Sequence, residues 1–134
     1  MCQVVTLDSC YSRYPDDNCA ALYPGSGFGA AKDPQAVFAN YLNHTSSQLL
    51  VQPYLASTAL AQQNGKPFYM FETNTASCGG FPGVSDSFGA ALWAADYALQ
   101  MAYSNFSAAN LHVGGLSDSY NVRCLKKTNF VRES

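Results

Sequence analysis

Glu72 is the residue of this chain best placed to carry out chemistry. It follows the apolar run at residues 68–71, which is bounded by Gly65 and Pro67 and is typical of a short buried strand. The sequence has one other glutamate, Glu133, close to its end. A carboxylate at the tip of an apolar strand is costly to bury unless it is paired or used. The residues therefore suggest a catalytic carboxylate, with a salt bridge or a helix cap as the alternative.

A polar, glycine-rich loop follows Glu72 and ends at Ser85, where a long apolar stretch begins. A strand, a charged residue at its carboxyl end, a loop and a helix, in that order, are how barrels and doubly wound sheets present catalytic groups. Ser77, Gly79 and Gly80 lie in this loop. Amides of a glycine-rich loop can approach an anion closely because no side chain intervenes.

The composition excludes several classes of protein. The chain has 134 residues, 48% of them hydrophobic and 12% charged, and a net charge of −2. This length suits one domain with a modest core, and the composition is that of a globular protein. Nothing in the charge suggests nucleic acid, and no run of about eighteen apolar residues suggests a membrane span.

The cysteines and histidines do not form a metal motif. None of the five cysteines is spaced as CxxC, and His44 and His112 do not complete a ligand set. We therefore expect no metal and no cofactor. Two glycosylation sequons begin at Asn43 and Asn105, and together with the cysteines they point to the secretory route. No signal peptide precedes them, which suggests that an amino-terminal part is missing.

The predicted elements alternate. Strands are expected at residues 3–8, 68–72 and 109–113, and helices at 33–42, at 46–63 with a break at Pro53, and at 85–104 with Ser85 as the cap. This order implies parallel strands joined by crossover helices. In the last helix the stripe predicted to be buried, widened by Trp93 and Met101, consists of Phe88, Leu92, Ala95, Leu99 and Ala102. Residues 122–134 gather charge without periodicity and are predicted to form a divergent, disordered tail.

The segment at residues 70–93, which reads MFETNTASCGGFPGVSDSFGAALW, resembles glycoside hydrolase family 79, the β-glucuronidase and heparanase family. Residues 14–19 and 111–115 also resemble it. The resemblance implies a retaining enzyme with a (β/α)₈ TIM barrel followed by a β-sandwich. It implies that residues 1–121 form a partial α/β barrel, about its sixth to eighth strands with their helices, which is incomplete as a stand-alone chain.

The resemblance also assigns roles. Glu72 matches the catalytic nucleophile, and Tyr14 and Tyr120 match substrate-contacting tyrosines. The loop through Ser77, Gly79 and Gly80 matches the one that holds the substrate's uronate carboxylate. Cys19 and Cys78 follow strands that would be neighbours in the barrel, so a disulfide between them is expected, with two free thiols as the alternative.

The implied partner is a carbohydrate that contains glucuronic acid, and the implied location is extracellular. The family's acid/base glutamate would precede Met1, so this chain carries the nucleophile without the acid/base. Two departures stand out: Arg13 replaces a frequent histidine, and Ser77 replaces a tyrosine of heparanase-like members. A non-catalytic carbohydrate-binding remnant and an unstable truncated chain remain alternative readings.

Overall fold

The described part of the chain in this computed structural model comprises residues 5–7, 32–77 and 79–113. Three strands form one parallel sheet in sequence order: β1 (Val5–Leu7), β2 (Phe68–Thr73) and β3 (Ala108–Leu111). The parallel pairing predicted from the sequence is confirmed. A partial barrel stays a prediction, because parallel strands in sequence order occur in barrels and in open sheets alike.

Helix α2 (Pro34–Tyr41) begins where the sequence predicts it. The Asp33 carboxylate accepts a hydrogen bond from the Gln35 N–H at 3.0 Å, and Pro34 occupies the first helical position. Both features suit a helix start, since the side chain satisfies an unpaired N–H and proline lacks one.

The next helical segment is divided at Pro53, as predicted. Helix α3 (His44–Val51) starts two residues before the expected Ser46 because the Asn43 side chain caps it, accepting from the Thr45 N–H at 3.1 Å. A 3₁₀ turn, η1 (Gln52–Tyr54), then leads into α4 (Leu55–Gln63). Proline lacks the N–H that a continuous α-helix needs, so its position in the 3₁₀ turn is consistent with the break between the two helices.

Helix α5 (Phe88–Tyr103) corrects two predictions. Its cap position is Ser87 rather than Ser85. Its buried residues are Gly89, Trp93, Tyr97 and Met101, which confirms the predicted burial of Trp93 and Met101. The rest of the predicted stripe faces outward: Phe88 is 78% exposed and Leu99 is 73% exposed. The helix is apolar nearly all round, so periodicity could not decide which face is buried.

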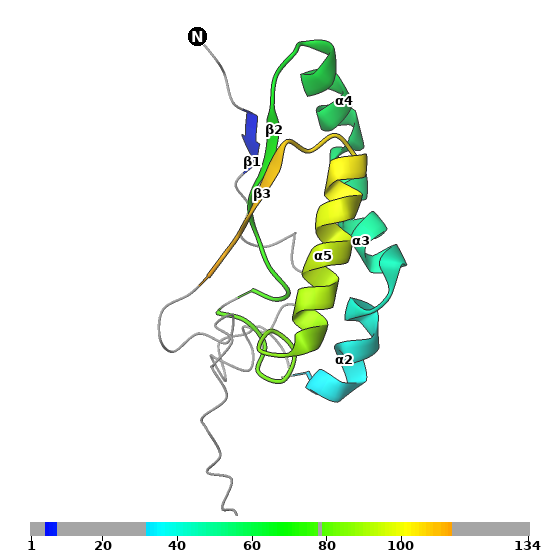
Figure 1. The fold of residues 1–134 in the computed structure, drawn as a ribbon, viewed down its shortest axis with the longest axis vertical. Helices are drawn as coiled ribbons and strands as arrows, with labels where there is room; N and C mark the ends of the chain where they lie inside the picture. Colours follow the sequence, from blue (N-terminus) through cyan, green and yellow to red (C-terminus); the bar gives the residue numbers. More distant parts are fainter. Residues whose placement is uncertain (1–4, 8–31, 78, 114–134) are drawn as a thin grey trace, which may run out of the picture.

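Figure 1 shows α2 to α5 on one side of the sheet, and the core lies between these helices and β2. Phe68 and Met70 point into it from the strand. The Trp93 ring stacks on Tyr97 with centroids 5.1 Å apart and meets the edge of Tyr41 at 6.4 Å. Among the described residues, no helix is long and apolar enough to cross a membrane.

Candidate active site

A β-bulge in β2 aims Glu72 away from the core. Met70 pairs with Ala109 and Thr73 pairs with Leu111, so two residues of β2 oppose one residue of β3. The buried side chains accordingly change phase along the strand, from Phe68 and Met70 to Thr73. Without the extra residue, Glu72 would point toward the helices with Met70. Bulges of this kind commonly redirect a side chain next to an active site.

Beyond the end of β3, His112 faces Glu72. Its Nδ1 atom lies 3.7 Å from the Glu72 Oε1 atom, and the two side chains are 46% and 37% exposed. The backbone of His112 is held on both sides. Its N–H donates to the Thr73 carbonyl at 2.9 Å, and its carbonyl accepts from Asn74 Nδ2 at 2.5 Å. The carboxyl ends of two adjacent parallel strands thus place a carboxylate beside an imidazole, and both side chains are partly exposed.

The loop after Glu72 is closed by a pair of buried hydroxyl groups. Thr75 Oγ1 and Ser85 Oγ lie 2.6 Å apart, and Ser85 Oγ accepts from the Phe81 N–H at 2.7 Å. The Thr75 N–H donates to Asn74 Oδ1 at 2.7 Å, which joins this pair to the residue that holds His112. The two ends of the loop and the carboxyl end of β3 therefore belong to one hydrogen-bonded network.

The loop is also anchored to the helix layer. The Tyr41 hydroxyl donates to the Thr75 carbonyl at 3.0 Å in the buried interior. Ala76, Phe81 and Val84 are buried, so apolar side chains hold the loop in place as well. A loop fixed in this way can present its backbone to a ligand without having to be ordered first.

The glycines of the loop adopt conformations that side chains disfavour. Gly79 has φ 85° and Gly80 has φ 95°. The Gly80 N–H donates to the Ser77 carbonyl at 3.3 Å, which closes a turn. The Gly80 amide therefore already donates a hydrogen bond within the loop. This makes it a weaker candidate than Gly79 for binding the carboxylate of a uronate.

The structure places some of the predicted site residues and not others. Those within its described part are Glu72, Ser77, Gly79, Gly80, Asn43 and Asn105. The calls on Tyr14, Tyr120, Cys19 and Cys78, and the predicted tail at 122–134, lie outside the described residues. Both sequon asparagines are exposed, Asn43 as the cap of α3 and Asn105 in the turn after α5 with φ 64°. Their glycosylation stays a prediction.

Sequence reasoning missed the residues that support Glu72. In the sequence, His112 stands out only as a histidine that does not complete a metal ligand set, and Ser85 is predicted to cap a helix. Asn74 and Thr75 were not singled out at all. The available signal was a pair of hydroxyl residues, Thr75 and Ser85, on the two sides of a glycine-rich loop, because such a pair can hydrogen-bond across the loop and close it. Among the described residues, no three side chains of metal-ligating type gather into a site.

Comparison with known proteins finds a relative of part of this chain. The chain is 37% identical over 91 residues to a protein named β-glucuronidase from Aspergillus niger. The match covers 64% of this chain but only 17% of the Aspergillus protein, so the chain corresponds to a small part of that protein's length. No family model matches the chain, and no solved structure matches it. The similarity supports a glycoside hydrolase relationship for this chain.

Proposed function

We propose that this chain is the part of a retaining β-glucuronidase of glycoside hydrolase family 79 that carries the nucleophile, Glu72. Three observations support the proposal: the resemblance of residues 70–93, the name of the Aspergillus relative, and the site geometry. The role of Glu72 rests mainly on the register shift that turns it outward at the carboxyl end of the central strand, beside His112. In the proposed enzyme, β1, β2 and β3 are about the sixth, seventh and eighth strands of the barrel.

In a retaining mechanism the Glu72 carboxylate attacks the anomeric carbon of the sugar. The new bond forms as the glycosidic bond breaks, and the leaving oxygen takes a proton from a second carboxylic acid. Water then releases the sugar and restores both groups. In this proposal His112, whose Nδ1 atom lies 3.7 Å from the Glu72 Oε1 atom, helps to orient the attacking carboxylate.

The acid/base group belongs elsewhere in the proposed enzyme. Retention requires two carboxyl groups about 5 Å apart. Besides Glu72, three carboxylates occur among the described residues, and each makes another contact: Asp33 caps α2, Asp86 accepts from the Gly83 N–H at 2.7 Å, and Asp96 pairs with His44 at 2.8 Å. We therefore place the acid/base outside the described part of the chain.

Recognition of the sugar's carboxylate is proposed for the turn at residues 77–80. No lysine or arginine occurs between Lys66 and Arg123, so this stretch offers an anion no such cationic side chain, and we assign the contact to main-chain amides of the turn. The Gly80 amide already closes the turn, so Gly79 is the stronger candidate of the two glycines. The remaining parts of the proposal, namely a β-sandwich and an extracellular location, follow from the family resemblance.

Replacing Glu72 by glutamine tests the proposal. We expect Glu72→Gln to reduce hydrolysis of an aryl β-glucuronide at least about a thousandfold in the enzyme that carries this sequence, because an amide is a poor nucleophile. Asp86→Asn is the matched control, since its side-chain oxygen can still accept from the Gly83 N–H. Near-normal activity of Glu72→Gln, or an equal loss in both variants, would refute the assigned role.

A further inference from the structure

A concave surface lies at the last turn of α5, away from the loop that follows Glu72. It is a groove of about 370 Å³ between α3 and η1 on one side and the last turn of α5 on the other. Helix α5 has 16 residues, so its two ends are roughly 24 Å apart. The loop that follows Glu72 leads into the first turn, whereas the groove is at the last. It cannot be a subsite of the candidate active site. The residues that line it lie on described helices.

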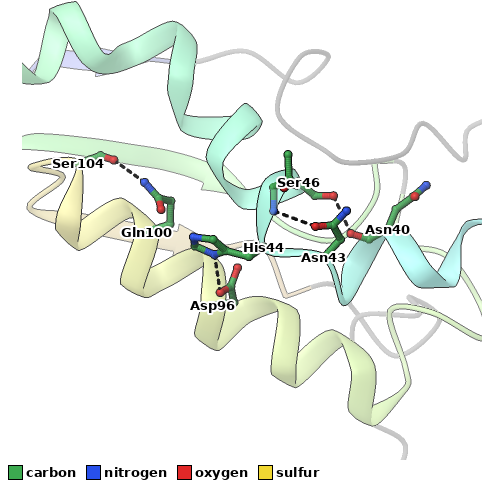
Figure 2. Close-up of polar contacts among 8 residues, drawn as sticks. Asn40, Asn43, His44, Ser46, Asp96, Gln100 and Ser104 are labelled. Atoms are coloured by element: carbon green, nitrogen blue, oxygen red, sulfur yellow. Dashed lines mark hydrogen bonds and ion pairs between the residues drawn. The ribbon is translucent and has the colours of Figure 1, made fainter.

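The polar part of the groove consists of uncharged amides and hydroxyls. Gln48 and Gln52 contribute amides one helical turn apart, and Gln100 contributes a third from α5. Figure 2 shows Gln100 beside Ser104, and the Gln100 Nε2 atom donates to the Ser104 Oγ atom at 3.0 Å. This bond holds the Gln100 side chain in place and leaves its carbonyl oxygen as an acceptor for a ligand.

The large apolar side chains that line the groove are unusually exposed to solvent. Tyr103 is 85% exposed at its rim, and Leu49 is 61% exposed on the opposite wall. An exposed tyrosine offers a flat apolar ring with a hydroxyl at its tip. A few convergent polar groups beside apolar walls are typical of small-molecule sites of this size.

Among the described residues, no charged side chain lines the groove. The nearest ion pair, His44 with Asp96 at 2.8 Å, lies one turn of α5 before Gln100 (Figure 2). Partial burial raises the pKa of Asp96, but the Ser47 hydroxyl and the hydrogen bond and charge of His44 lower it by more. The carboxylate is thus already occupied by His44. A phosphate or another anion would find no cation here, so the groove suits an uncharged ligand.

We propose that this groove binds a neutral saccharide, separately from catalysis. A pyranose ring has one face of C–H groups and a rim of hydroxyls. The face of C–H groups can stack on the Tyr103 ring. The hydroxyls can exchange hydrogen bonds with the side-chain amides of Gln48 and Gln100. Each amide can both donate and accept, which matches a hydroxyl group. The proposal does not depend on the role of Glu72.

Amide chemical shifts of the chain, followed during titration with cellobiose and lactose, test the idea. We expect shifts around Gln48 and Gln100 and unchanged shifts around Glu72. Tyr103→Ala should weaken binding at least about tenfold, because it removes the stacking surface. Leu49→Ala should weaken it by a smaller factor. Leu60→Ala is the matched control, being equally exposed at 61% on α4 but outside the groove, and should change affinity less than twofold.

Three results would overturn the proposal: no shifts at the groove with either sugar, unchanged affinity in Tyr103→Ala, or shifts confined to the loop after Glu72. Gln100→Ala gives a second variant should Tyr103→Ala fail to fold. Groove binding should also persist in Glu72→Gln. Its persistence while that variant's hydrolysis stays normal would reject the proposed nucleophile and leave the saccharide site standing.

Discussion

At the scale of single residues, Ser85 shows how a buried hydroxyl can support a site that it does not touch. Ser85 Oγ accepts from the Phe81 N–H and lies 2.6 Å from Thr75 Oγ1, and both Thr75 and Ser85 are buried. Removing it leaves a buried N–H without this acceptor. A buried group that loses its partner costs more than the net value of an ordinary hydrogen bond, because it has already given up its contact with water.

We therefore predict that Ser85→Ala lowers the free energy of unfolding by about 1–3 kcal/mol. Hydrogen exchange of the Phe81 amide should accelerate by more than this global change explains. Urea denaturation and amide exchange measure the two effects. Ser46→Ala is the control: its hydroxyl donates to the Asn40 carbonyl at 2.7 Å in an exposed setting, and its loss should cost under about 1 kcal/mol. Equal effects of the two substitutions would contradict a special role for Ser85.

The sequence was informative about Glu72 but not about the groups around it. A carboxylate after an apolar run is visible in the residues themselves, and its strand was predicted correctly. Its orientation depends on the bulge, which arises from the pairing of β2 with β3 some forty positions later. The same pairing brings His112 to Glu72. Contacts of this kind depend on strand register, which periodicity within one segment does not contain.

At the scale of elements, the packing of α5 against α2 depends on a glycine. A Cβ atom added at Gly89 would lie 2.5 Å from Phe38 Cζ, so the absence of a side chain allows the ring to approach the helix. Gly89 is buried on the same face as Trp93 and Tyr97. A glycine inside a helix usually weakens it by about 1 kcal/mol relative to alanine, so close packing has to offset that loss.

Gly89→Ala should destabilise the chain by about 1 kcal/mol or more, because overpacking outweighs the gain in helix propensity. The Phe38→Leu substitution provides the test of this cause. Alone it should be destabilising, but in the Gly89→Ala background it should cost clearly less, giving a coupling energy of about 1 kcal/mol. Thermal unfolding of both single variants and the double variant supplies the cycle. Additive effects would show that the two residues do not press on each other.

The positions of the helices were predicted more accurately than the faces that they bury. The start of α2 and the break at Pro53 follow from local signals, a cap and a proline, that act within a few residues. The buried face of α5 does not. Leucines at 92 and 99 have the right spacing for a core stripe but are exposed, and Tyr97 fills the core beside Trp93, whose burial is predicted. In a helix with so few polar residues, shape complementarity with neighbouring helices selects the face, and it cannot be read from hydropathy.

At the scale of the whole molecule, the described part of the chain leaves apolar surface uncovered. Phe88, Leu92 and Leu99 form an outward stripe along α5, and β1 and β3 are the two edges of the described sheet. Monomeric proteins rarely expose continuous apolar patches of this kind, and free strand edges invite pairing with other chains. In the proposed enzyme, further strands of a barrel would pair with both sheet edges.

The chain by itself should therefore self-associate as its concentration rises, and the α5 stripe should be the main cause. Sedimentation velocity over a range of concentrations measures this. We expect the double substitution Phe88→Gln with Leu99→Gln to shift the chain toward the monomer, because it removes two large apolar side chains from the exposed stripe. The helical circular dichroism should be unchanged, because both side chains are exposed and contribute little to the core. Leu42→Gln with Leu60→Gln is the control pair. Both leucines are exposed, but Leu42 lies just after α2 and Leu60 lies on α4, away from the α5 stripe. A chain that stays monomeric at every concentration, or two double variants with the same effect, would remove the stripe as an interface. Helical signal lost from the α5 pair alone would instead mean that the stripe contributes to folding.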